Sequence, residues 1–221
     1  MARWLHGQMV PSSHWADDSG LVALGGSLDP DRLVAAYRAG VFPWSSDPVI
    51  TWWSPDPRAI FDLQSFEVSR SVKKSIRRAG WRFSIDQAFE RTMRACAEET
   101  SDRPGTWITD NFIASYVELH RRGLAHSVEV WRQAELVGGL YGVTLGGFFG
   151  GESMFHRDTD ASKAAVAYLV EQLRGSGFAL LDAQVPTPHL LSLGATEISR
   201  PDYLERLEKA VRLDVKFAKL E

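Results

Sequence analysis

The chain has 221 residues, of which 44% are hydrophobic and 24% are charged, and its 25 basic and 28 acidic side chains give a net charge of −3. These values are typical of a globular protein and exclude a largely disordered, collagen-like or coiled-coil chain. Because the net charge is slightly negative, any attraction to a polyanion would have to come from a local basic patch. The single cysteine, Cys96, the lack of an apolar secretory leader and the lack of any apolar run near ~18 residues predict a cytoplasmic protein that does not span a membrane.

Prolines punctuate the first 57 residues and restrict regular structure there to short pieces. One helix is predicted over 30–38, because Asp29 precedes a proline at the first helical position and Gly40 follows the last turn. Residues 41–44 are predicted to be extended, and residues 50–58 to be a strand end that passes into a proline-fixed turn. We therefore predict a small N-terminal domain over 1–57 and a larger domain over 58–221.

The larger part alternates between patterns typical of helices and patterns typical of strands. Helices are predicted over 71–78, 87–98, 110–122, 162–174 and 202–211, and strands over 59–63, 82–85, 125–131, 135–144, 148–155 and 178–183. The adjacent strands between 125 and 155 are predicted to pair antiparallel, whereas the helix at 162–174 is a crossover that makes two strands parallel. The sequence thus predicts an α+β fold, a mixed sheet with helices on its faces.

Glycines gather in two stretches, 138–142 and 146–151, that lack the Lys-Ser/Thr ending of a phosphate-binding loop and do not open a helix. A hairpin with bulges at its glycines would account for both stretches without any function. Glu152, however, follows these glycines and precedes an apolar Met-Phe pair, where missing side-chain bulk lets a ligand come close. A carboxylate in this position is a candidate for binding a cation.

Asp182 and Gln184 are polar residues in the otherwise apolar run 180–185. In a regular strand, residues two apart share a face, so both side chains are expected to point the same way. Two buried polar groups form either a satisfied core network or a site. Considered beside Glu152, the site interpretation is favoured, because parallel strands of such sheets often present functional residues at their carboxyl ends.

Four cations fall on one arc of the helix predicted at 71–78 and its flank, namely Arg70, Lys74, Arg77 and Arg78. Such a run is commonly a solvated helix face. It is also an arrangement that neutralises several phosphates, even on a protein that is acidic overall. Both interpretations stay open from this feature alone.

Tryptophans are frequent in the segments that are rich in proline or loop, namely Trp44, Trp52, Trp53 and Trp107, and Tyr37 and Tyr116 lie nearby in the sequence. Nucleic-acid bases stack on such rings, and a basic surface beside them is typical of proteins that hold single-stranded nucleotides. Most of the eight tryptophans are nevertheless expected to lie in the core. The six histidines show no metal-binding spacing, so no metal site is predicted.

Several longer motifs occur in order along the chain. They are GLVALGG (20–26), AYRAGVFPW (36–44), WWSPDPR (52–58), TWI (106–108), AHSVEVW (125–131), LVGGLYG (136–142), GESMF (151–155) and HLLSLGA (189–195). Through these motifs the chain resembles the bacterial leucyl/phenylalanyl-tRNA-protein transferases over about residues 20–203. Because the motifs are long, ordered and numerous, the resemblance is far more specific than any single feature above.

The resemblance implies an enzyme that transfers Leu or Phe, and Met less well, from aminoacyl-tRNA to proteins with an N-terminal Arg or Lys. This modification marks the acceptor for degradation under the N-end rule. The donors would be Leu-tRNA, Phe-tRNA and Met-tRNA, and neither a metal nor any cofactor besides this co-substrate is implied. The implied fold is a small N-terminal domain followed by one similar to the acetyltransferases of the GNAT superfamily.

The resemblance also implies roles for individual residues. Trp44 and Trp107 would hold the terminal adenosine of the tRNA, with Tyr116 in the same site. The pocket for the transferred side chain would consist of Leu140, Phe149, Val166, Leu169 and Leu181. Glu152, Asp182 and Gln184 would be the catalytic group, and Arg70, Lys74, Arg77 and Arg78 would bind tRNA.

The implied reaction is aminolysis of an ester, in which the α-amine of the acceptor attacks the aminoacyl carbonyl. An α-amine has a reference pKa of about 7.7 to 8.0, so a neutral fraction exists at cellular pH and a strong base is not demanded. On this view the Gln184 carbonyl accepts a hydrogen bond from the amine and Asp182 orients Gln184. Glu152 would position the substrate and recognise its amine.

Two other functions stay open on the sequence. Residues 172–177 superficially fit the CoA pyrophosphate loop of N-acetyltransferases, but they are predicted to end a helix, whereas such a loop opens one. A non-catalytic module that binds basic N-termini or RNA would also be compatible with Asp182 and Gln184.

Overall fold

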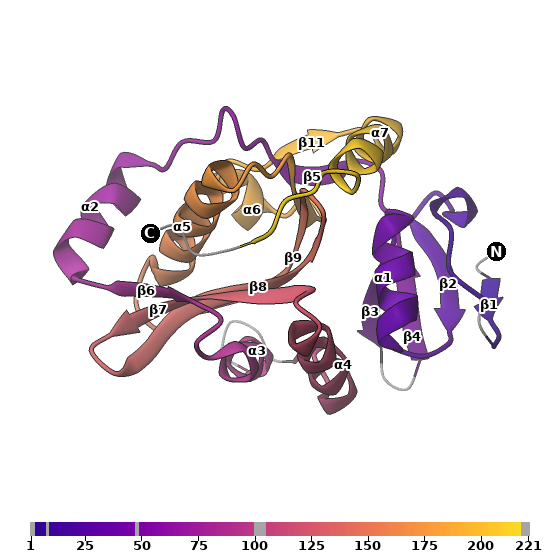
Figure 1. Cartoon of the computed structure of the whole chain (residues 1–221), viewed down its shortest axis with the longest axis horizontal. Coiled ribbons are helices and arrows are strands. Elements are labelled where there is room, and N and C mark those ends of the chain that lie inside the picture. The colour runs from indigo at the N-terminus through magenta and orange to yellow at the C-terminus, as the bar shows by residue number, and fades with distance from the viewer. Residues whose placement is uncertain (1–2, 8, 47–48, 100–104, 218–221) are drawn as a thin grey trace.

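The computed structural model describes residues 3–7, 9–46, 49–99 and 105–217 (Figure 1). Its elements are β1 (Arg3–Leu5), a 3-10 helix (Ser13–Trp15), β2 (Leu21–Gly25), α1 (Pro30–Arg38), β3 (Phe42–Ser46), β4 (Val49–Trp53), β5 (Arg58–Phe61), α2 (Arg70–Ala79), β6 (Arg82–Ile85), α3 (Phe89–Ala97), α4 (Asp110–Arg121), β7 (Ala125–Arg132), β8 (Glu135–Leu145), β9 (Phe148–His156), α5 (Ala161–Gly175), β10 (Leu180–Gln184), α6 (Pro188–Ser192), β11 (Thr196–Ile198) and α7 (Arg200–Ala210). Within these ranges, no helix is long and apolar enough to cross a membrane.

The strands form two mixed sheets. The smaller sheet has the order β1-β2-β4-β3, and the larger has the order β11-β5-β10-β9-β8-β7-β6. In the larger sheet, β7, β8 and β9 pair antiparallel, whereas β9 and β10 are parallel because α5 crosses between them. Both of these pairings confirm the sequence predictions.

The six predicted helices and the six strands predicted beyond residue 57 all occur, each within two residues of its expected bounds. The small sheet was not predicted as a sheet, and β1, β2, α6 and β11 were missed. Each of these missed elements has only three to five residues, which is too short to display a clear hydrophobic period. The three missed strands also depend on pairing with strands elsewhere in the chain.

The N-terminal helix begins as its sequence predicts. The Asp29 carboxylate accepts hydrogen bonds from the backbone N–H groups of Asp31 and Arg32 at 3.0 and 3.3 Å, which satisfies two free donors of the first turn. Leu33 and Tyr37 lie on the buried face of this helix. The same face that packs the helix therefore carries the Tyr37 hydroxyl into the interior.

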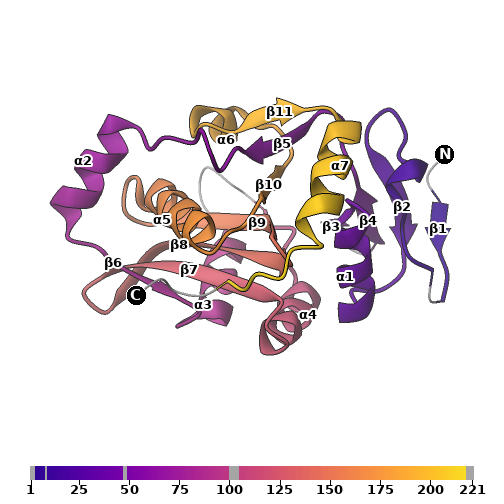
Figure 2. The same ribbon diagram turned by 45° about the horizontal axis from the view of Figure 1, so that its top comes forward.

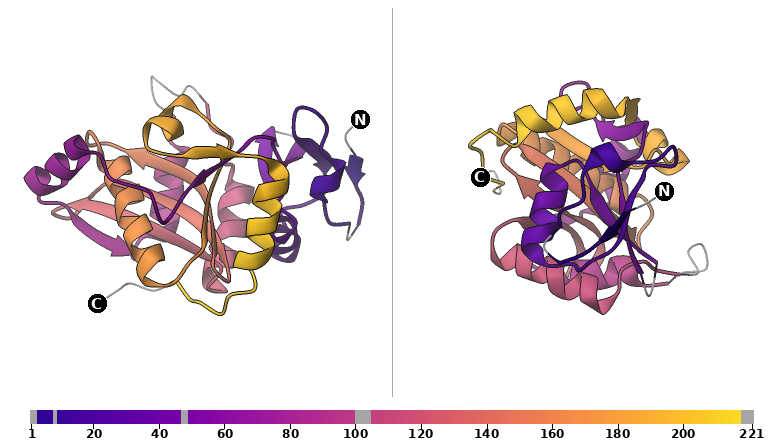
Figure 3. Two further views of the ribbon diagram at one scale, coloured as in Figure 1. Left: turned by 90° about the horizontal axis from the view of Figure 1, so that it is seen from above. Right: turned by 90° about the vertical axis from the view of Figure 1, so that its right-hand side faces the viewer.

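The large sheet is covered on both faces (Figures 1 and 2). Helix α5 packs against one face, and α3 and α4 pack against the other. The small sheet lies at one end of the molecule, and α2 lies at the opposite end (Figure 3). The site described below is therefore built in the middle, where β8, β9 and β10 run side by side.

The hydrophobic core continues from the small sheet into the large one. Val22 and Trp52 of the small sheet belong to the same buried cluster as Tyr141 and Phe148 of the large sheet. A second cluster fills the space between the large sheet and α5. Because the two sheets share a core, the division into two domains at residue 57 stays a prediction.

Candidate functional site

A bulge in β9 turns Glu152 into the interior. Tyr141 pairs with Ser153 and Gly142 pairs with Gly151, so Glu152 lies opposite no residue of β8. Bulges of this kind re-aim a side chain. Gly142 is required for this arrangement, because a Cβ atom at that position would lie 2.3 Å from atoms of β9. The glycine-rich segments thus form the predicted bulged hairpin, and the bulge also presents a carboxylate.

Three hydrogen bonds hold the Glu152 carboxylate. The Tyr37 hydroxyl donates to Oε1 at 2.7 Å, the Tyr116 hydroxyl donates to Oε2 at 3.1 Å, and the Gln184 side-chain amide donates to Oε1 at 2.9 Å. The hydroxyl groups of Tyr37 and Tyr116 also contact each other. The network joins α1, α4, β9 and β10, which are far apart in the sequence.

Burial raises the pKa of Glu152 from 4.5 to about 7, because the enclosed site disfavours the charged carboxylate. The hydrogen bonds from Tyr37 and Tyr116 act in the opposite direction, since they stabilise the charged form. Burial also raises the pKa of both tyrosines well above the usual value of 10.0, so their hydroxyl groups remain donors. Glu152 is therefore an acid that exchanges its proton near neutral pH.

The raised pKa of Glu152 predicts a pH-dependent stability. Since the folded-state pKa is about 7 and the ordinary value is 4.5, the stability linked to this group is complete below about pH 4.5 and is lost as the pH rises through about 7. The free energy of unfolding of Glu152→Gln minus that of the native protein should therefore be larger at about pH 8 than at about pH 5, by up to about 3 kcal/mol. Urea unfolding of both proteins at the two pH values measures this difference, and an equal difference at both would contradict the prediction.

Asp182 is held in a second buried network. Its carboxylate accepts hydrogen bonds from Arg58 Nε at 2.9 Å and Arg58 Nη2 at 2.6 Å, and from the Tyr203 hydroxyl at 2.9 Å. The side chains of Arg58 and Asp182 are each only 1% exposed. Arg58 also lies between the rings of Phe42 and Tyr203, at 4.8 and 4.3 Å from their centroids. The ion pair thereby joins the N-terminal segment, β5, β10 and α7.

The prediction that Asp182 and Gln184 share one face of a regular strand is wrong. The register of β10 against β5 shifts between these two residues, and Gln184 adopts a left-handed conformation with φ of 65°. Asp182 therefore faces Arg58, while the side chain of Gln184 faces Glu152. The backbone N–H of Gln184 donates to Asp182 Oδ1 at 2.8 Å, which holds this unusual turn.

An apolar cavity of about 100 Å³ lies beside Glu152 and Gln184. Four of the five side chains predicted to form the pocket line it: Leu140, Val166, Leu169 and Leu181. Phe149 does not line it, because its buried ring packs on Phe217 at a centroid distance of 5.5 Å. Four further apolar side chains that were not predicted also line it: Phe61, Met154, Ala183 and Leu190.

The aromatic residues predicted to bind adenosine lie in different surroundings. Trp44 on β3 is 40% exposed and packs edge-on against Trp53 at 6.2 Å. Trp107 is half-buried just before α4 and packs edge-on against Phe112 at 5.4 Å. Tyr116 is fully buried, so its ring offers no open face to a base and its hydroxyl serves Glu152 instead.

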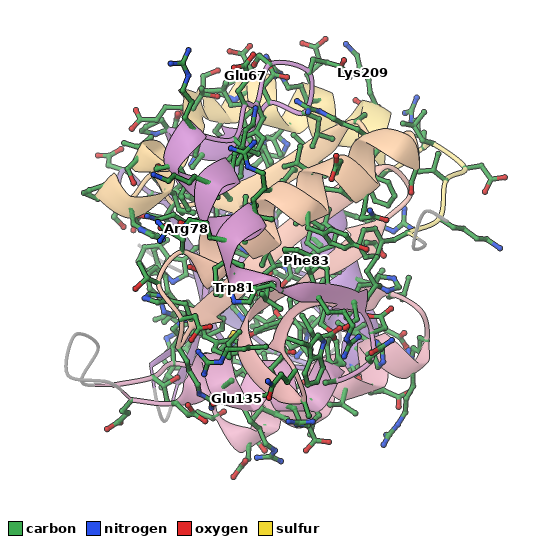
Figure 4. The ribbon with its side chains drawn as sticks, turned by 90° about the vertical axis from the view of Figure 1, so that its left-hand side faces the viewer. Glu67, Arg78, Trp81, Phe83, Glu135 and Lys209 are labelled. Carbon is green, nitrogen blue, oxygen red and sulfur yellow. The ribbon has the colours of Figure 1, made fainter. Side chains whose placement is uncertain are left out.

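The four predicted tRNA-binding cations lie on α2. Arg70, Lys74, Arg77 and Arg78 are all exposed, whereas Val72 on the same helix is buried. Figure 4 looks onto this end of the molecule, with Arg78 labelled beside the ribbon of α2. The structure therefore brings these cations together on one helix, away from the small sheet.

Comparison with known proteins decides the family. Residues 60–208 match the family described as leucyl/phenylalanyl-tRNA protein transferase, and residues 26–56 match the N-terminal domain of that family. The leucyl/phenylalanyl-tRNA--protein transferase of Hahella chejuensis is 51% identical over 205 residues, which cover 92% of this chain and 88% of the relative. The protein of that name from Shewanella sediminis is 50% identical over 205 residues, 91% of this chain and 87% of the relative.

The chain belongs to the leucyl/phenylalanyl-tRNA protein transferase family. This confirms the resemblance seen in the sequence motifs, and it makes the chain an aminoacyltransferase. Among solved structures, the chain is similar to that of L-PGS from Bacillus licheniformis, with 12% identity, a TM-score of 0.48, and coverage of 83% of this chain and 70% of that one. This match is too weak to indicate which substrates the transferase uses.

Three polar side chains of the transferase site were not predicted as site residues: Tyr37, Arg58 and Tyr203. Tyr37 offered one signal, since a tyrosine on the buried face of a helix needs a partner for its hydroxyl. Arg58 and Tyr203 offered none, because their partner Asp182 lies 124 and 21 residues away. Among the described residues, no group of three or more His, Cys, Asp or Glu side chains is arranged to hold a metal ion.

Proposed function

We propose that this transferase moves a leucyl or phenylalanyl group, and a methionyl group less well, from aminoacyl-tRNA to proteins that begin with Arg or Lys. The product would carry an N-end rule degradation signal. The observation that carries the proposal is an apolar cavity, lined by Leu140, Val166 and Leu169, directly beside the polar pair Glu152 and Gln184. The apolar cavity suits the side chain of Leu, Phe or Met, and the polar pair suits the amine of the acceptor.

The orientation of Gln184 supports a role in aligning the attacking amine. Its side-chain N–H donates to Glu152, which leaves its carbonyl oxygen as the atom that accepts from the amine. The Asp182 carboxylate fixes the turn that carries Gln184. Catalysis in this arrangement is largely positional, because the amine and the ester carbonyl are held in place before they react.

We also propose that residues 58–221 form a domain similar to the GNAT acetyltransferases, that residues 1–57 form the small N-terminal domain, and that the protein works in the cytoplasm. The mixed seven-stranded sheet, with its parallel β9–β10 pair at the cavity, supports the first assignment. The separate four-stranded sheet supports the second. Trp44 and Trp107 remain candidates for the tRNA adenosine, and α2 remains the candidate tRNA-binding surface.

The structure disfavours a CoA-dependent acetyltransferase. The N–H groups of Gly177 and Phe178 donate to the carbonyls of Arg174 and Leu173 at 3.2 and 2.9 Å, and Gly177 has φ of 79°. These bonds close the C-terminus of α5. The glycine-containing stretch at 172–177 thus uses backbone N–H groups to form hydrogen bonds within the end of a helix, and it does not open a helix whose N–H groups could bind a pyrophosphate.

Peptide mass after incubation with the purified chain tests the proposed function. With Leu-tRNA as donor, a peptide that begins with Lys should gain one leucyl residue, and the same peptide with an N-terminal Asp should gain none. Acetyl-CoA serves as the matched donor control and should leave the mass unchanged. An acetyl increment, or peptide binding without any increment from Leu-tRNA, would contradict the proposal.

A further inference from the structure

The oxygen atoms of Glu152, Tyr37 and Tyr116 form a closed triangle of hydrogen-bond contacts. Each tyrosine hydroxyl contacts the carboxylate, and the two hydroxyls contact each other. Three contacts need three hydrogens, but the two hydroxyl groups supply only two. When Glu152 is ionised, one side of the triangle therefore lacks a hydrogen, and a proton on Glu152 completes it. The triangle therefore has a place for one proton, while the two hydroxyl groups that donate to the carboxylate stabilise its charged form and so limit how tightly that proton is held.

The other buried carboxylate of the site is already fully engaged. Asp182 accepts from both Nε and Nη2 of Arg58, from the Tyr203 hydroxyl and from the backbone N–H of Gln184. These four donors and the buried ion pair with Arg58 occupy the Asp182 carboxylate. Gln184 has no basic group. Among the cavity-lining residues that the structure describes, Glu152 is therefore the carboxylate that is held by no ion pair and has a place for a proton.

We propose that Glu152 accepts the proton that the acceptor α-amine loses during transfer, and that the hydroxyl groups of Tyr37 and Tyr116 set its affinity for that proton. The inference rests on the proposed function and deepens it. The amine nitrogen forms a bond to the ester carbonyl carbon, and the bond from that carbon to the ribose oxygen breaks. The proton moves from the nitrogen to Glu152 and then to the departing ribose oxygen, so the carboxylate ends the cycle ionised.

The surroundings of Glu152 suit this role. The ionisable groups that face it are Tyr37 from α1, Tyr116 from α4, Tyr141 from β8, and Asp182 from β10 with its partner Arg58 from β5. Glu152 is half-buried and lines the cavity, and its pKa of about 7 lies where a general base is most effective at cellular pH. Tyr37 and Tyr116 are positioning residues, since they act on the substrate through Glu152.

Carbon-13 NMR of the full chain labelled at the glutamate carboxyl carbon tests the affinity without any need for activity. The signal that Glu152→Gln removes should titrate with a midpoint of about 7. Tyr37→Phe and Tyr116→Phe should each raise that midpoint by about one pH unit, because each removes a hydrogen bond that stabilises the charged carboxylate. Tyr141→Phe is the matched control. The buried hydroxyl of Tyr141 has no hydrogen-bond partner within the described residues, so its removal should move the midpoint of Glu152 far less. Equal shifts in all three variants, or none in the first two, would overturn the proposal.

Single-turnover transfer from Leu-tRNA to a saturating Lys peptide tests the catalytic consequence. Glu152→Gln should slow transfer by about 10² to 10⁴-fold while Leu-tRNA binding is retained. In Tyr37→Phe, the acidic limb of the pH–rate profile should move to higher pH by the same number of pH units as the NMR midpoint. A Glu152→Gln rate within about threefold of the native rate would overturn the proposal while the proposed function stood. A native protein that transfers no leucine would overturn both, and the two failures are thereby distinguishable.

Discussion

Replacement of Arg58 by methionine is expected to lower the free energy of unfolding by about 3 to 5 kcal/mol, because it leaves the buried charge of Asp182 without its partner. Methionine keeps the unbranched apolar stem of Arg58 and removes the guanidinium group, with its charge, its hydrogen bonds and its contacts with the rings of Phe42 and Tyr203. Arg58 also donates to the Gly40 carbonyl at 3.2 Å, so the loss extends to the connection with the N-terminal segment. Chemical unfolding at neutral pH measures the effect.

The double variant Arg58→Met, Asp182→Asn is the control for this prediction. It removes both charges, so it should recover a substantial part of the stability that the single variant loses. A single variant within about 1 kcal/mol of the native protein would contradict the account of the ion pair. So would a double variant as unstable as the sum of the two single changes.

Neutralising the four exposed cations of α2 should weaken aminoacyl-tRNA binding by about 100-fold at low salt, because their contacts with phosphates release counterions. The variant changes Arg70, Lys74, Arg77 and Arg78 to glutamine. In a plot of log affinity against log salt concentration, the slope should become shallower by about 3 to 4. Fluorescence titration with Leu-tRNA at several salt concentrations measures both quantities.

A second quadruple variant controls for net charge. It changes Arg121 on α4 and Arg206, Lys209 and Arg212 on or just after α7, which are also exposed. Because it removes the same number of charges at other places on the surface, it should change the slope much less. If both variants lose the same affinity and the same slope, binding depends on overall charge and the assignment of α2 is wrong.

The long elements could be predicted from the sequence because their signals are local. The Asp29 cap and the β-branched and aromatic residues of β7 and β8 identify these elements without any knowledge of their partners. β1 and β2 could not be predicted in the same way. They have three and five residues, and they become strands because they pair with each other and, through β2, with β4.

The candidate site was predictable in composition but not in geometry. Glu152, Asp182 and Gln184 stand out as polar residues in glycine-rich or apolar surroundings, and the structure brings them to one cavity. Their directions depend on a bulge at Glu152 and on the left-handed backbone of Gln184, which break the alternation that a regular strand predicts. The hydrogen bond from Tyr37 spans 115 residues of sequence, so no local pattern could have indicated it.

The assignment of the cavity to the transferred side chain is tested most directly by competition between Phe-tRNA and Leu-tRNA for one Lys peptide, using Val166→Phe. Val166 lines the cavity, and a phenyl ring there would occupy space that the larger donor side chain needs. The ratio of phenylalanyl to leucyl product should fall by about 10-fold or more, and Val166→Leu should give an intermediate fall. An unchanged ratio in Val166→Phe, with both donors used at native rates, would show that the transferred side chain binds elsewhere.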